Sequence, residues 1–327
     1  MKRIEIVIKA IEKFPDVPSL TLAKMLYKKH PLMFSSVENC RSAVRYRRGN
    51  KGKKSMGDLK DKSMTRPNGK AGYTAEIPAS IARPKKPFKI PDGKTLLMSD
   101  IHVPYHDDKA LRAALEHGDR LEPDNVVLNG DILDFFSVSR WEKNPEERNM
   151  AKELQLSRQF LSHLRSRYPK ARIIYKMGNH EERWEKYMWT KAPEICGCTD
   201  FQLYKLLDFA KYGIEEVAGK QKMKAGKHLT IIHGHELFGA NAPINFARTL
   251  QTNLGVCTIA GHRHNTSEHS QKTADDKYVT CWSLGCLCDM APEYAIINKW
   301  THGFATFELK GNDFKVDNKR IINGEVV

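Results

Sequence analysis

Apolar residues follow two different spacings along the 327-residue chain. Up to residue 48 the apolar positions follow helical spacing, and the first set is Ile4, Val7, Ile8 and Ile11. Phe14-Pro15 ends this segment, Ser19 can cap a second helix, and Ser35 or Ser36 can cap a third. The pattern therefore predicts three short helices over residues 1–48.

Between residues 95 and 264, short apolar runs bounded by glycine are typical of buried strands. Helical apolar spacing over 107–121 and 147–168 indicates β-α-β crossovers, so we expect an α/β fold with a parallel core. Residues 311–327 alternate apolar and polar side chains, which predicts terminal strands.

Five of the apolar runs lead into side chains that can bind metals. These side chains are Asp100, His102, Asp131, Asn179, His233, His262 and His264. Because the carboxyl ends of parallel strands meet at one edge of a sheet, we expect the seven residues to converge. Two carboxylates, one amide and four imidazoles suit borderline divalent metals. They suffice for two ions if a carboxylate bridges them, and such a pair of ions suits displacement at phosphorus.

The motifs around these residues resemble those of the calcineurin-like metallophosphoesterase superfamily. They are Asp100-x-His102, Gly130-Asp131, Gly178-Asn179-His180, His233 and Gly261-His262-x-His264. The resemblance covers roughly residues 95–310. It implies a catalytic domain over residues 94–327 with a four-layer α/β/β/α sandwich, in which helices flank two mixed sheets and the site lies at the strand ends.

The same resemblance implies a role for each side chain. Asp100, His102 and His264 would hold the first metal, and Asn179, His233 and His262 the second, with Asp131 bridging. His180 matches the catalytic histidine that is not a ligand, and Asp134 matches the carboxylate that orients it. A metal-bridging hydroxide is then expected to attack phosphorus in line with the leaving oxygen, which His180 assists. For the two ions we expect Mn²⁺, with Fe, Zn or Ni as alternatives.

Protein Ser/Thr phosphatases of the superfamily differ from this chain around two motifs. Ser99 stands where they have Gly, and Phe135 follows Asp134 where they continue with Arg-Gly. The tract 100–107 looks more like that of metallophosphoesterases from phages and mobile elements, several of which carry a basic N-terminal helical domain. Phosphoprotein substrates are therefore disfavoured.

The excess of positive over negative charge lies in the first third of the chain. Residues 1–95 contain 23 Lys and Arg against 8 Asp and Glu, which accounts for the whole net charge of +15. A basic segment on a neutral body is typical of a device that docks on a polyanion, and a solvated tail is the alternative. Arg41, Arg45 and Arg48 share one face of the third predicted helix, a pattern typical of helix-turn-helix domains.

We therefore predict a helix-turn-helix-like, nucleic-acid-binding domain over residues 1–48. Residues 49–93, rich in Gly, Ser, Lys and Pro, predict a flexible basic linker. The candidate nucleic-acid contacts are Arg41, Arg45, Arg47, Arg48, Lys51, Lys53 and Lys54.

Together these features predict a phosphodiesterase that hydrolyses nucleic acid, most simply a DNA endo- or exonuclease. One alternative is a phosphomonoesterase or nucleotide phosphatase with an unrelated basic tail. Two others are a non-catalytic binding protein on a retired phosphoesterase fold and a metal-free DNA regulator formed by residues 1–48.

Other residues bear on the cellular compartment, on possible zinc ligands and on the role of the aromatic side chains. Seven cysteines, an odd number, favour a reducing cytosol over a disulfide framework. The chain start lacks a signal sequence and no long apolar run suits a bilayer, so we expect a cytoplasmic protein without a membrane partner. We interpret Cys196-x-Cys198 and Cys286-x-Cys288 as buried thiols rather than zinc ligands. Core packing is favoured over base stacking for Phe135, Phe136, Trp141, Trp184, Tyr187 and Trp189.

Overall fold

The computed structural model describes residues 2–49, 78–140, 149–237, 245–292 and 295–327. The chain divides into two compact units, Met1–Arg83 and Pro84–Val327, and each has its own core. Within the described ranges, every helix is too short or too polar to cross a membrane. Lys51, Lys53, Lys54 and Trp141 lie outside the described residues.

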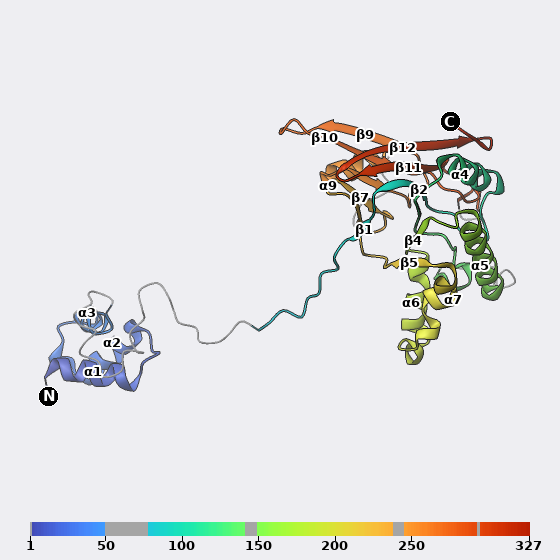
Figure 1. The fold of residues 1–327 in the computed structure, drawn as a ribbon. Helices are drawn as coiled ribbons and strands as arrows, with labels where there is room; N and C mark the ends of the chain where they lie inside the picture. The colour runs from blue at the N-terminus through green and yellow to red at the C-terminus, as the bar shows by residue number, and fades with distance from the viewer. Residues whose placement is uncertain (1, 50–77, 141–148, 238–244, 293–294) are drawn as a thin grey trace. The chain divides into compact units, whose positions relative to one another are not determined.

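Three helices build the first unit, as the apolar spacing predicts (Figure 1). They are α1 (Arg3–Lys13), α2 (Ser19–Lys29) and α3 (Val37–Arg47), with a short 3-10 turn at Pro31–Met33. Ser36 caps α3 by accepting from the Asn39 amide, whereas Ser19 is the first residue of α2 and not its cap. Ile4 is 49% exposed and lines an open cleft between α1 and α3, so Ile6 replaces it in the core.

Arg48 turns back on the first unit and does not join a shared cationic face. Its Nη1 donates to the carbonyl oxygen of Val17 at 2.7 Å, and its Nη2 donates to those of Phe14 and Pro15 at 3.1 and 3.0 Å. Arg41 pairs with Glu38 at 3.3 Å. The expected alignment of Arg41, Arg45 and Arg48 is therefore wrong for Arg48, because carbonyls of the turn between α1 and α2 bind its guanidinium.

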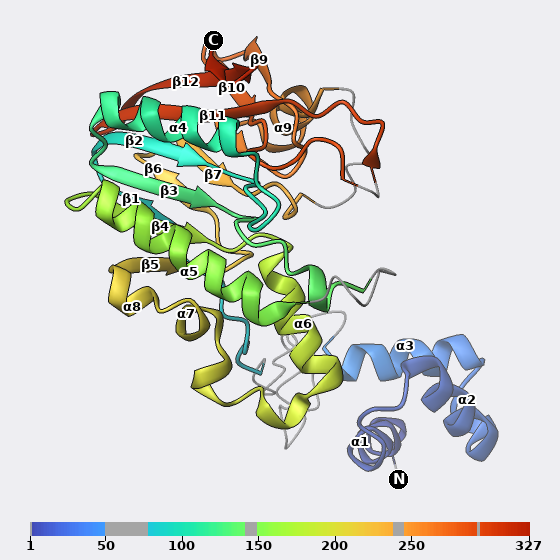
Figure 2. The ribbon, with the colours of Figure 1, turned by 90° about the vertical axis from the view of Figure 1, so that its right-hand side faces the viewer.

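The second unit contains two mixed β-sheets (Figure 2). The seven-stranded sheet has the order β13 (Glu325–Val326), β12 (Asp313–Ile322), β11 (His302–Lys310), β2 (Gly93–Met98), β3 (Asn125–Asn129), β4 (Arg172–Lys176) and β5 (Ile214–Val217). The six-stranded sheet has the order β1 (Phe88–Ile90), β6 (Met223–Ala225), β7 (Leu229–Ile232), β8 (Thr258–Ala260), β10 (Tyr278–Ser283) and β9 (Ser267–Lys272). Strands β2 to β5 are parallel, and β12 and β13 are the terminal strands predicted over 311–327.

Alternation along the central strands explains the layers. Leu97, Val127 and Ile174 are register partners that face the second sheet, while their neighbours in sequence face the helices. The helices α4 (Asp108–Leu121) and α5 (Met150–Arg167) cover the outer face of the seven-stranded sheet (Figure 2). On the other side, α9 (Phe246–Leu254) packs on the six-stranded sheet. The four-layer sandwich is thus confirmed.

Three shorter helices complete the second unit. They are α6 (Glu181–Lys191), α7 (Leu203–Leu206) and α8 (Phe209–Tyr212). The predicted linker over 49–93 extends too far, because Phe88–Ile90 forms β1 and pairs with β6. The Gln221 side chain also donates to the carbonyl oxygen of Lys86 at 2.8 Å. The second unit therefore begins before residue 94.

Candidate metal centre

All seven predicted ligands follow the carboxyl ends of strands. They are Asp100 and His102 after β2, Asp131 after β3, Asn179 after β4, His233 after β7, and His262 and His264 after β8. The first three strands belong to the seven-stranded sheet and the last two to the six-stranded sheet. The two sheets therefore deliver their polar ends to one place, as the parallel topology predicts.

The backbone at the centre is bent sharply. Five of the ligands have left-handed φ values, which are 55° for Asp100, 53° for His102, 53° for Asp131, 70° for His262 and 52° for His264. A residue other than glycine pays roughly 1 kcal/mol or more in this region, and such strain gathers at functional sites. It turns each side chain inward immediately after its strand.

The glycines of the motifs leave room for the ligands. A Cβ added to Gly130 would collide with the ring of His233, and one added to Gly178 would collide with Asp131. A Cβ on Gly261 would collide with Asp100 and Ser99. Each Gly is therefore required by the close approach of two loops and not only by a turn.

One half of the centre gathers Asp100, His102 and His264. Asp100 Oδ1 lies 3.2 Å from His264 Nε2, and His102 Nε2 lies 3.3 Å from the same nitrogen. All three residues are at least 94% buried. His102 and His264 form, together with Cys288, a group whose ligand atoms all lie within 4.8 Å of one another. The binding of a divalent cation by Asp100 with the two histidines stays a prediction.

The other half gathers Asn179, His233 and His262 around Asp131. His233 Nε2 lies 3.2 Å from Asp131 Oδ2 and 3.2 Å from Asn179 Oδ1. Ligand atoms of Asp131, His233 and His262 all lie within 4.8 Å of one another. Asp131 Oδ1 accepts from the His180 amide at 2.9 Å. The donors fit a second cation, and their role as ligands stays a prediction.

Asp134 contacts two histidines rather than one. Its Oδ1 lies 3.2 Å from His180 Nδ1, the contact expected, and 3.0 Å from His102 Nδ1. The His180 ring also has its Nδ1 2.8 Å from the Asp134 carbonyl oxygen. Asp134 therefore orients a predicted ligand together with the predicted catalytic histidine.

The charges of the centre are strongly coupled. Burial opposes ionisation of Asp100, but His264 and His233 outweigh it and hold the Asp100 pKa below its usual range. Burial also opposes protonation of His233 and His264, but Asp131 and Asp100 raise the pKa of His233 to about 10, and Asp100 raises the pKa of His264 to about 10. Burial and the neighbouring His233 lower the pKa of His262 to about 3. Without metals, imidazolium cations thus balance the buried carboxylates.

Glu181 is a functional residue whose role sequence reasoning missed. Its fully buried carboxylate accepts from the amides of Asp131, Ile132, Leu133 and Gly178, at 3.0, 2.8, 3.2 and 2.7 Å, and from the Tyr175 hydroxyl at 2.8 Å. Glu181 directly follows the Gly178-Asn179-His180 motif, but the spacing of residues could not show that its carboxylate bridges two loops.

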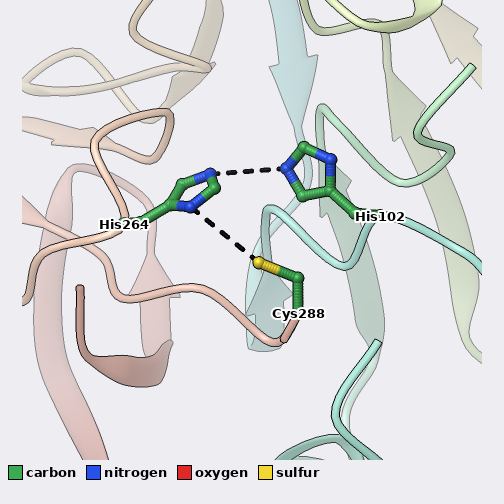
Figure 3. Close-up of side chains that lie close together, drawn as sticks. All are labelled: His102, His264 and Cys288. Carbon is green, nitrogen blue, oxygen red and sulfur yellow. Dashed lines mark hydrogen bonds between the residues drawn. The ribbon is translucent and has the colours of Figure 1, made fainter. Parts of the chain in front are cut away.

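Cys288 also contacts the centre, as Figure 3 shows. Its Sγ lies 3.8 Å from His264 Nδ1, on the far side of the ring from the nitrogen that faces His102. The neighbouring Leu287 amide donates to the Asp100 carbonyl oxygen at 3.0 Å. All seven cysteines are free, and Cys286 and Cys288 are buried, as expected. The expectation is wrong for Cys196, which is half-buried, and for Cys198, which is exposed, because they lie between the short 3-10 turns Pro193–Ile195 and Thr199–Phe201. Cys288 in addition supports a predicted ligand.

Two further histidines near the motifs pair with carboxylates. His235 pairs with Glu182 at 3.1 Å, and His106 pairs with Asp108 at 3.3 Å. Phe135 is fully buried and stacks on Trp184 at 6.4 Å, which agrees with core packing. The prediction is wrong for Tyr187 and Trp189, because they are 40% and 60% exposed.

Proton release should accompany metal binding. His233 and His264, with pKa values raised to about 10, carry protons at pH 7, and a metal needs their free nitrogen lone pairs. We expect about two protons to leave per chain at pH 7 and fewer as the pH rises through 10. Calorimetry in buffers of different ionisation enthalpy measures this number. A binding enthalpy that is the same in all buffers at pH 7 would contradict it.

Replacing Cys288 should weaken metal binding. Cys288→Ala removes the sulfur that His264 Nδ1 faces, and loss of such a partner costs roughly 10-fold or more in metal affinity. Cys281→Ala is the matched control, because Cys281 is equally buried and its Sγ contacts the Val256 carbonyl oxygen. Titration calorimetry compares the two. Equal affinities in the two variants would show that the sulfur does not support His264.

The chain is similar to several known proteins. The Gene 54 protein of Mycobacterium phage L5 is 29% identical over 245 residues, which cover 71% of this chain and 94% of the relative. A Vps29 single mutant from Entamoeba histolytica is 14% identical with a TM-score of 0.37, over 72% of this chain and 96% of that chain. The phosphoesterase YfcE from E. coli is 16% identical with a TM-score of 0.34, over 65% and 87%. The family model of calcineurin-like phosphoesterases matches residues 93–279, more than half of the chain, and the chain therefore belongs to that family.

Proposed function

We propose that this chain is a metal-dependent phosphodiesterase that hydrolyses nucleic acid, with DNA as the favoured substrate. The observation that carries the proposal is the convergence of seven N/O donors, five of them buried, after strands of both sheets, in a family of hydrolases that act on phosphoester bonds. Two divalent ions, Mn²⁺ by preference, would supply a Lewis acid and an activated water. Asp100, His102 and His264 would hold one ion and Asn179, His233 and His262 the other, with Asp131 between them.

Residues of the chain itself would serve the leaving group. His180 follows the predicted ligand Asn179 directly, and its ring lies 4.4 Å from that of His102. Asp134 fixes its Nδ1, so the ring presents Nε2 toward Asp131 at 3.8 Å. A proton held on Nε2 would be available to the departing oxygen of a phosphodiester.

The first unit supplies the reason to favour nucleic acid. Arg47 lies with Lys2 and Arg3 along a cleft of about 620 Å³ between α1 and α3, which Tyr46 also lines. Cations beside an exposed aromatic ring suit phosphates and bases. Among the described residues that line this cleft, none is acidic. Arg45 and Arg47 stay predicted contacts, whereas Arg48 is bound to backbone carbonyls.

A substrate panel tests the activity. Purified protein with Mn²⁺ is incubated with single-stranded, duplex and nicked DNA, with RNA, and with aryl mono- and diesters. We expect DNA cleavage that Asp131→Asn reduces by at least about 100-fold, because the residue predicted to bridge both ions is altered. Turnover of the monoester without cleavage of any nucleic acid would favour the phosphomonoesterase instead.

Truncation should separate binding from chemistry. A chain that begins at Pro84 keeps β1 and the cores of the second unit. We expect it to bind DNA about tenfold more weakly and with a flatter salt dependence, because phosphate contacts and their counterion release are lost. Hydrolysis of an aryl diester should change less than about twofold, since no residue of the centre is removed.

A matched pair of charge variants controls this experiment. Alanine at Lys2, Arg3 and Arg47 removes three cations from the cleft, and alanine at Lys24, Lys28 and Lys29 removes three exposed cations from α2. Fluorescence anisotropy over a range of salt concentrations should show weaker binding for the first set only. Full-length affinity in the truncated chain would refute a binding role for the first unit.

A further inference from the structure

Arg183 reaches the edge of the metal centre from the first turn of α6. Its Nη2 donates to His180 Nε2 at 2.7 Å, and its Nη1 donates to the Asp134 carbonyl oxygen at 2.9 Å. The Asp134 carboxylate lies further away, at 3.7 Å. The guanidinium therefore contacts both groups predicted to act on the leaving oxygen.

The bond to His180 occupies the nitrogen that the chemistry needs. His180 Nδ1 faces the Asp134 carbonyl oxygen at 2.8 Å and so carries a hydrogen. Nε2 is then the acceptor for Arg183, and it is also the ring nitrogen that lies 3.8 Å from Asp131. An ester that places its leaving oxygen near Nε2 must meet the guanidinium first.

Exposure separates Arg183 from its two partners. Its side chain is 22% exposed, whereas those of His180 and Asp134 are each 10% exposed. The guanidinium thus borders on solvent while its partners lie behind it. Its fork has five donors, and it makes short bonds to His180 and to the Asp134 carbonyl among the residues that the structure describes. A planar cation at the rim suits two oxygens of a phosphoryl group.

We propose that Arg183 is a substrate-binding residue that takes a non-bridging phosphoryl oxygen. On binding, Nη2 would exchange its bond to His180 Nε2 for a bond to that oxygen, and Nη1 would keep its bond to the Asp134 carbonyl. The exchange frees the lone pair of Nε2 only when an ester is present, so that a proton taken up there from solvent can pass to the leaving oxygen. The inference rests on phosphoester hydrolysis within the proposed function and does not require that the substrate be nucleic acid.

Inorganic phosphate is the probe that tests this inference. The full-length, Mn²⁺-loaded protein is titrated with phosphate by calorimetry, and KM and kcat are measured with an aryl phosphodiester. We expect Arg183→Gln to weaken phosphate binding and raise KM by about tenfold or more, as loss of a charge-assisted hydrogen bond requires. Arg183→Lys keeps the charge without the fork and should fall between the two.

Lys186→Gln is the matched control. Lys186 lies on the same helix, is 57% exposed and pairs with Glu182 at 2.8 Å. It should leave phosphate affinity and KM unchanged. Metal affinity should also be equal in all three variants and the parent, which separates substrate binding from damage to the centre.

Two results would overturn the inference. One is a parent protein that binds no phosphate, and the other is an Arg183→Gln variant with parental phosphate affinity and KM but a reduced kcat, which would make Arg183 only a support for His180. If Arg183→Gln does not fold, parental phosphate affinity in Arg183→Lys has the same force. Failure to cleave DNA would count against the nuclease proposal alone, because neither readout uses nucleic acid.

Discussion

The geometry of the centre depends on one buried carboxylate. Glu181 accepts four backbone amides and one hydroxyl, and in this way it joins the loop after β3 to the loop after β4. Asp131, which is predicted to bridge the two ions, and Asn179, which is predicted to bind one of them, stand on those two loops. Without the carboxylate, four buried amides would lose their acceptor at a cost of roughly 1–3 kcal/mol each. A charge that is never expected to touch substrate therefore decides whether the ligands can meet.

A buried ion pair joins the two sheets. Lys176 at the end of β4 is fully buried and lies 2.8 Å from Glu236, which follows β7. Glu236 in turn accepts from the amides of His233 and Gly234 at 3.2 and 2.7 Å. A buried ion pair is weak support for stability in general, but here each partner also binds backbone groups. It holds the His233 loop against the seven-stranded sheet and so aligns the two halves.

The sequence is most informative where the place of a residue, directly after an apolar run, predicts its role. The seven ligands could be predicted because polar side chains follow apolar runs, and topology alone brings such positions together. Arg183, Cys288 and Arg48 could not be assigned in this way. The role of each depends on where its side chain points: Arg183 toward His180, Cys288 toward His264 and Arg48 toward Val17. No rule of residue spacing predicts that direction. Strand β1 was missed because three residues within a Lys- and Pro-rich tract carry no visible alternation.

Protons and metals compete for the same nitrogens, and this competition explains how the centre can form before any ion binds. Asp100 and Asp131 are buried beside His264 and His233, whose raised pKa values keep them cationic at neutral pH. The imidazolium groups thus offset most of the electrostatic cost of burying two carboxylates. An arriving metal displaces protons from a site that is already shaped, so little backbone needs to reorder. The strained left-handed loops are consistent with this view, because a preformed site must hold its strain in the absence of the ion.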